Sequence, residues 1–139
     1  MNKLELNFFS YLELEKISLG IFSPLNGFMN EKDFYSVSNF MRLSNGKIFP
    51  IPVVLSVYED QYEKVKKYPV IRLFYNEDCV GKISQESVFR PNFPKILPKV
   101  FGTKDINHPG YKMLSNAGNV CIGGAVKLTK RIVHPLSKY

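Results

Sequence analysis

The stretch GIFSPLNGFM at positions 20–29 constrains the fold more than any other part of the chain. Pro24 fixes its own backbone angle φ and restricts the residue before it. Gly20 and Gly27 supply backbone conformations that a side chain would disfavour. The stretch carries no ionisable side chain. We therefore predict a rigid apolar loop that plugs a core or docks against a neighbour. The candidate docking residues are Phe22, Ser23, Pro24, Leu25, Phe28 and Met29.

The segments on both sides of this loop are patterned as helices. Before it, Ser10 and Glu13 have the spacing of a capping box, and Gly20 is a plausible left-handed stop. After it, Asn30 is placed to cap a second helix. Each helix has an apolar stripe at helical spacing. These stripes are Tyr11, Leu14 and Ile17 in the first helix, and Phe34, Val37 and Met41 in the second.

From Ile48 onward the apolar period changes to two, which is typical of strands. We expect strands over 53–58, 70–75, 79–84 and 120–133, with a short helix over 59–67 and a second one starting at Pro109. The two strands at 70–75 and 79–84 form a hairpin, and Gly123 and Gly124 mark a bulge or a close backbone approach. Short strands with small helices predict an α+β fold, a small curled β-barrel carrying short helices.

Length and composition favour one globular domain. The chain has 139 residues and is 45% hydrophobic, enough to bury about two thirds of its unfolded surface. No apolar run approaches the roughly 20 residues of a membrane-spanning helix, and the first residues lack the layout of a signal peptide. We therefore expect a cytoplasmic protein without a membrane partner. In that compartment Cys79 and Cys121 are expected to be free thiols, buried in the core.

Positive charge is concentrated late in the sequence. Residues 1–89 hold 10 Lys/Arg against 11 Asp/Glu, a net charge of −1, whereas residues 90–139 hold 9 against 1, a net charge of +8. Two interpretations stay open: a solvated basic surface, or a surface for an anionic partner such as RNA or an acidic protein. The candidate anion or RNA contacts are Lys127, Lys130 and Arg131.

No set of residues predicts catalysis, a metal site or a cofactor site. His108 and His134 are the only histidines, and any catalytic triad would have to use one of them. The glycine-rich residues 118–124 lack the Gly-Lys-Ser/Thr ending of a phosphate-binding loop. The adjacent acids at 59–60 and 77–78 are expected to diverge into solvent rather than act as a catalytic pair.

Several sequence blocks follow one another in a recognisable order: GIFSPLNGFMN (20–30), MRLSNG (41–46), FPIPVVL (49–55), VFGTKD (100–105), HPG (108–110) and AGNVCIGG (117–124). Together they resemble the amino-terminal, PUA-like domain of the ATP sulfurylases (sulfate adenylyltransferases). The resemblance spans roughly residues 4–131 and departs most from the family in the segment 90–99, whose three prolines exclude an ordinary helix. It places the domain at 1–133 and the start of a linker at 134–139.

The family joins ATP and sulfate into adenosine 5′-phosphosulfate and pyrophosphate. The resemblance implies that its catalytic segments, a Gln-x-Arg-Asn-Pro pattern and a His-x-x-His pattern, lie in the domain that follows. Neither pattern occurs in this sequence. ATP and sulfate would then bind that catalytic domain, and this chain would be an inactive scaffold for it, in cis or in trans, or for contacts in a homo-oligomer. The alternatives are a stand-alone PUA-like module that binds RNA and an independent small enzyme.

Overall fold

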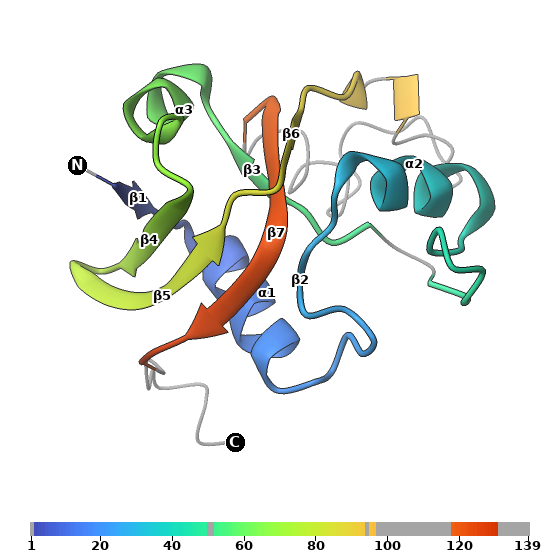
Figure 1. The fold of residues 1–139 in the computed structure, drawn as a ribbon, viewed down its shortest axis with the longest axis horizontal. Coiled ribbons are helices and arrows are strands. Elements are labelled where there is room, and N and C mark those ends of the chain that lie inside the picture. The colour runs from blue at the N-terminus through green and yellow to red at the C-terminus, as the bar shows by residue number, and fades with distance from the viewer. Residues whose placement is uncertain (1, 50–51, 94, 97–117, 131–139) are drawn as a thin grey trace.

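The computed structural model describes residues 2–49, 52–93, 95–96 and 118–130. A curled, half-barrel sheet carries three short helices (Figure 1). The expected α+β class and PUA-like curled sheet are confirmed. Among the described helices, none is long and apolar enough to cross a membrane. The elements are β1 (Lys3–Glu5), α1 (Phe8–Ser18), β2 (Gly27–Phe28), α2 (Glu31–Phe40), β3 (Leu55–Val57), α3 (Glu59–Val65), β4 (Val70–Tyr75), β5 (Asp78–Ser84), β6 (Ser87–Phe89) and β7 (Val120–Leu128).

Strand β7 is the centre of the sheet, because four other strands pair with it. Its first half pairs with β3 on one side and β6 on the other, and its second half pairs with β2 and β5. Strands β4 and β1 extend the sheet beyond β5, with β1 parallel to β4 and the other pairs antiparallel. In Figure 1, β7 accordingly runs through the middle of the molecule.

Gly123 and Gly124 mark the point where β7 exchanges partners. A Cβ atom on Gly124 would lie 1.8 Å from the Ser84 carbonyl oxygen, and one on Gly123 would lie 2.4 Å from the Met29 carbonyl oxygen. Gly124 also has φ of +152°, a conformation that side chains disfavour. The close backbone approach predicted here is therefore confirmed, and it is what lets the sheet curl.

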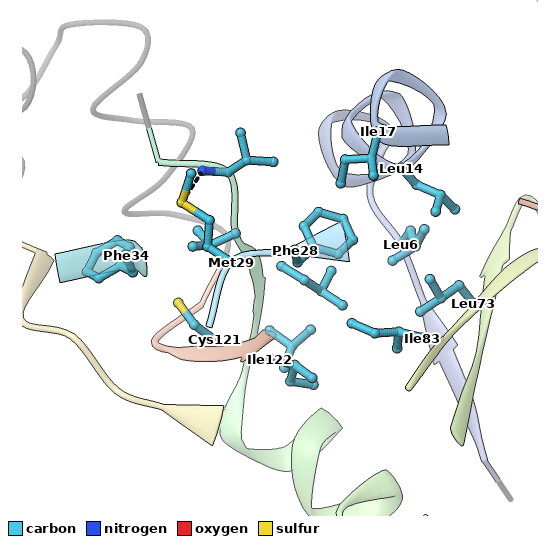
Figure 2. Close-up of a cluster of buried hydrophobic side chains, with 14 of the residues drawn as sticks. Leu6, Leu14, Ile17, Phe28, Met29, Phe34, Leu73, Ile83, Cys121 and Ile122 are labelled. Atoms are coloured by element: carbon cyan, nitrogen blue, oxygen red, sulfur yellow. Dashed lines mark hydrogen bonds between the residues drawn. The ribbon is translucent and has the colours of Figure 1, made fainter. Parts of the chain in front are cut away.

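The core lies between α1 and the concave side of the sheet. Leu14 and Ile17 of α1 are buried on the side of the sheet that carries Leu73 and Ile83 (Figure 2). Tyr11 of the same helix is also fully buried. The predicted stripe of this helix is thus confirmed. Its stop is also confirmed, because Gly20 has φ of +80° and its N–H donates to the Ile17 carbonyl, while the Ile21 N–H donates to that of Lys16.

Two helix predictions need correction. Helix α1 begins at Phe8 instead of Ser10, because the Asn7 side chain caps it by accepting a hydrogen bond of 2.7 Å from the Ser10 N–H. Helix α2 begins directly after Asn30, and its predicted cap is thus confirmed. The predicted apolar stripe of α2 is wrong at Met41, which is 59% exposed. The helix ends at Phe40, and Met41 has φ of +53°, which turns its side chain away from the core.

The strand predictions hold where local sequence decides them. The hairpin is confirmed, and its two turn residues, Asn76 and Glu77, both have positive φ. The strand expected over 53–58 is limited to Leu55–Val57, and β7 ends at Leu128. In the proline-containing segment 90–99, residues 93 and 95–96 are helical, and the Asn92 side chain accepts a hydrogen bond of 3.3 Å from the Lys95 N–H. As far as the segment is described, the exclusion of an ordinary helix stays a prediction. The helix expected from Pro109 lies outside the described residues.

Candidate functional site

The predicted docking loop is divided between core and surface. Phe28 and Met29 are 3% and 1% exposed, and the Met29 sulfur accepts a hydrogen bond of 3.4 Å from the Val53 N–H (Figure 2). Phe22 and Leu25 are half-buried, whereas Ser23 and Pro24 are exposed. The second half of the loop therefore plugs the domain's own core. Docking by the exposed half stays a prediction.

The exposed half of the loop lies beside the end of β7. The Asn26 carbonyl accepts a hydrogen bond of 3.1 Å from the Val126 N–H. An open hollow of about 360 Å³ lies between the end of α1 and this part of β7, and Leu19 at its rim is 52% exposed. The structure thus brings the loop close to Lys127, one of the predicted anion contacts. Lys130 pairs with Asp78 at 3.0 Å, and Arg131 lies outside the described residues.

Three exposed apolar residues lie at the end of α2 and on the short hairpin that follows, where Arg42 and Ile48 pair. We call these residues the α2-end patch: Phe40, Met41 and Ile48, which are 71%, 59% and 71% exposed. The hairpin is fixed by hydrogen bonds of 2.8 Å from the Phe49 N–H to the Met41 carbonyl and from the Ser44 N–H to the Asp33 carboxylate. These apolar side chains are therefore displayed on an ordered backbone.

The sequence pattern did not predict the α2-end patch. Continuing the helical period places Met41 among the buried residues, but the left-handed conformation at this residue breaks that period. The signal that was present is Ile48, an apolar residue that directly follows the polar turn at 44–47 and precedes the apolar stretch starting at Phe49. Such a residue is as compatible with a strand start as with an exposed patch, so the pattern alone does not distinguish them.

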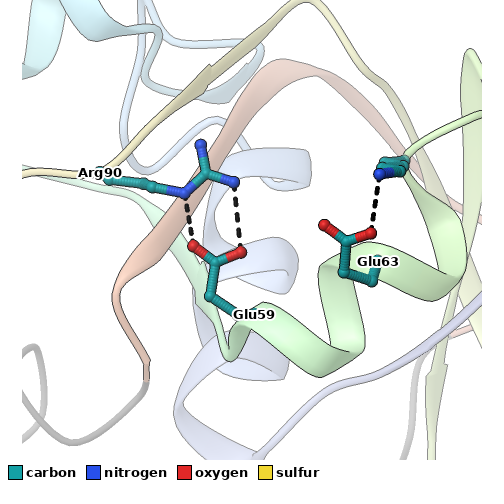
Figure 3. A network of polar contacts seen from close by, with 4 residues as sticks. Glu59, Glu63 and Arg90 are labelled. Atoms are coloured by element: carbon teal, nitrogen blue, oxygen red, sulfur yellow. Dashed lines mark hydrogen bonds and ion pairs between the residues drawn. The ribbon is translucent and has the colours of Figure 1, made fainter.

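One acid of each adjacent pair, Glu59 and Asp78, forms an ion pair at the surface. Arg90 donates from Nε and Nη2 to the two carboxylate oxygens of Glu59, the second contact measuring 3.2 Å (Figure 3). These hydrogen bonds lower the pKa of Glu59. Glu63 on the same helix pairs with Lys66 at 2.7 Å. Glu59 and Asp78 are therefore each matched by a cation at the surface.

The two cysteines are free thiols, as predicted, but only Cys121 is fully buried. Burial raises the pKa of the Cys121 thiol to about 12, despite a contact of 3.6 Å with the Ser56 hydroxyl that lowers it. This thiol is therefore neutral at physiological pH and is a poor nucleophile. Within the described ranges, no group of three or more His, Cys, Asp or Glu residues is placed to hold a metal. Both histidines lie outside those ranges.

The fold and surfaces together define a small α+β domain that exposes apolar and charged surfaces around a curled sheet. Its sequence matches the PUA-like domain family over residues 1–131, and the chain belongs to that family. Its relatives include sulfate adenylyltransferases from Pyrococcus abyssi (33% identical over 137 residues, 99% of this chain and 35% of the relative) and Trichodesmium erythraeum (39% over 135 residues, 96% and 35%).

A further relative is the sulfate adenylyltransferase of Schizosaccharomyces pombe, 35% identical over 136 residues. The chain spans about a third of the length of these relatives, and it corresponds to their amino-terminal PUA-like domain. Among solved structures, the hexameric APS kinase from Thiobacillus denitrificans has a similar fold, with a TM-score of 0.68 and 19% identity over 96% of this chain and 22% of that chain. This likeness supports the fold alone.

Proposed function

We propose that this chain is a non-catalytic scaffold domain of a sulfate adenylyltransferase. The remainder of that enzyme would bind ATP and sulfate and form adenosine 5′-phosphosulfate. The main support is that the whole chain matches about a third of each relative. A domain of this kind contributes through its surfaces, and the α2-end patch is the one we assign to docking with the catalytic domain.

The α2-end patch has the physical properties of a docking surface. Burial of a large apolar side chain contributes about 1.5–3 kcal/mol, and both Phe40 and Ile48 are 71% exposed in the chain as it stands. The hydrogen-bonded hairpin already holds Met41 and Ile48 in place, so little conformational entropy would be lost on binding. Exposed apolar clusters at ordered backbone mark interaction sites more often than isolated apolar residues do.

A chimera tests this proposal. The chain replaces the corresponding third of the Trichodesmium erythraeum enzyme, and pyrophosphate release from ATP and sulfate is measured together with thermal unfolding. We expect the chimera to be active and the chain alone to release no pyrophosphate. Joint substitution Phe40→Ser and Ile48→Ser should lower the unfolding midpoint of the chimera while leaving that of the isolated chain unchanged.

Ile21→Ser is the matched control, because Ile21 is 63% exposed on the predicted docking loop. If this variant weakens the chimera and the Phe40/Ile48 variant does not, the loop is the docking surface and the assignment of the α2-end patch is wrong. Pyrophosphate release by the isolated chain would contradict the non-catalytic role itself. Homo-oligomer formation stays a prediction, which light scattering of the chain and of the chimera checks.

A further inference from the structure

Four basic residues stand in register across four neighbouring strands of the sheet. Lys3 on β1 is opposite Arg72 on β4, Arg72 is opposite Lys82 on β5, and Lys82 is opposite Lys127 on β7. All four are exposed, whereas the residues that alternate with them, such as Leu4, Leu73 and Ile83, are buried. These strands lie side by side in Figure 1. We call these four residues the basic row.

The described residues do not neutralise the basic row. None of its members forms an ion pair with a carboxylate of the described residues. Glu5 lies on the same strand face, opposite Phe74, and is not ion-paired with the row either. Like charges directly opposite each other destabilise a sheet. Four like charges in succession therefore lower the stability of the sheet, and a bound anionic partner would relieve this repulsion.

The row is unsuited to stacking of nucleobases. Phe74 is the single aromatic residue on the outward positions of β1, β4, β5 and β7, as far as these strands are described. The Lys3 ammonium and the Arg72 guanidinium lie over its ring, at 4.6 and 5.5 Å from the centroid. Readers of single-stranded RNA use open aromatic platforms, and this ring is already occupied by cations. The observations favour a protein partner.

The spacing of the row matches an acidic helix. Neighbouring strands lie about 4.8 Å apart, so successive cations repeat at about that interval across the sheet. Acidic residues three and four positions apart on one face of a helix have Cβ atoms about 5–6 Å apart. Alternate residues of an extended segment repeat at about 6.6 Å and would lose register. Arg72 is held in place by a hydrogen bond of 3.0 Å from its Nε to the Asn2 side chain.

We infer that the basic row binds a helix of a partner protein whose Asp or Glu residues recur at i, i+4, i+7 and i+11, laid across strands β1, β4, β5 and β7. This binding site is additional to the proposed docking through the α2-end patch, which lies on the other side of β7 (Figure 1). The domain then has two separate interaction surfaces, one apolar and one basic.

Titration of the 139-residue chain with three labelled probes tests this inference. The first is a helical peptide with glutamates at i, i+4, i+7 and i+11, the second is a peptide of equal composition with its glutamates spread around the helix, and the third is a uridine oligonucleotide of equal charge. We expect the first peptide to bind about tenfold more tightly than the other two at low salt. Lys82→Glu, which interrupts the row at its centre, should weaken that binding about tenfold.

Lys32→Glu is the control, because it makes the same change in net charge on α2, where Lys32 is exposed. It should change the affinity less than about twofold, since rim charges away from the contact act weakly. Equal binding of both peptides, equal effects of the two substitutions, or no binding would overturn the inference. Tighter binding of the oligonucleotide, lost with Lys82→Glu, would also overturn it and identify a nucleic-acid surface instead. Thermal unfolding of each variant verifies that the chain remains folded.

Discussion

Glu13 is a carboxylate in the core, where a charge is costly. It is 8% exposed on α1, and its Oε2 atom has no hydrogen-bond partner among the described residues. Burial raises the pKa of Glu13 above its ordinary value of 4.5, and the charge of Lys16 counteracts this only in part. A carboxylate whose pKa is higher in the folded state destabilises that state when it is ionised.

The sign of the pH dependence follows from this direction. Above the pKa of Glu13 in the folded state, the ionised carboxylate destabilises the fold to its full extent. This destabilisation is lost as the pH falls through that pKa toward 4.5. Glu13→Gln should therefore raise the free energy of unfolding at pH 7 by about 1 kcal/mol, with a smaller gain as the solution is acidified. Urea titrations between neutral and acidic pH measure both effects. Glu86→Gln, at an exposed position, should have little effect; a gain for Glu13→Gln that stays constant with pH would contradict the argument.

At the scale of elements, the local sequence predicted those features of helices and strands that depend on interactions between neighbouring residues. Two predictions were confirmed: the buried stripe at Tyr11, Leu14 and Ile17, and the hairpin formed by β4 and β5. Both depend on side-chain period and turn chemistry, which act over a few residues. The ends of elements were less predictable. Asn7 replaced Ser10 as the cap of α1 because both residue types cap well, and only the position of the helix against the sheet decides between them.

Gly124 gives a test of the partner exchange in β7. Gly124→Ala should destabilise the domain by about 3 kcal/mol or more, because its Cβ would meet backbone atoms of Ser84 and the φ of +152° is itself strained. Gly46→Ala is the matched control: Gly46 also has positive φ, of +90°, but open space around it. It should cost about 1 kcal/mol. Chemical denaturation compares the two, and equal losses would show that backbone conformation alone, without the contact at Ser84, accounts for the effect.

At the scale of the whole molecule, the pattern of short strands and small helices and the family resemblance both predicted the fold class, but the sequence did not predict the charged face. Counting charges along the chain directed attention to residues 90–139, where the net charge is +8. Three of the four members of the basic row, Lys3, Arg72 and Lys82, instead come from residues 1–89, whose net charge is −1. Strand order and register bring these residues together, and neither can be read from local sequence. The α2-end patch was missed for a similar reason, since one backbone angle at Met41 exposes it.

The repulsion within the basic row should appear in the stability of the isolated domain. The chain has a net charge of +7, and Lys82 lies between Arg72 and Lys127, so the row concentrates positive charge on one face. Lys82→Glu replaces two repulsive cross-strand pairs by attractive ones and should stabilise the chain by about 1 kcal/mol at low salt. Salt screens exposed charges, so the unfolding midpoint of the unmodified chain should rise with added sodium chloride, and the advantage of Lys82→Glu should shrink.

Lys32→Glu lowers the net charge equally but leaves the row intact, so it should stabilise less. Thermal unfolding across a salt series separates the two variants. If both stabilise the chain equally, total charge rather than the cross-strand register governs the repulsion.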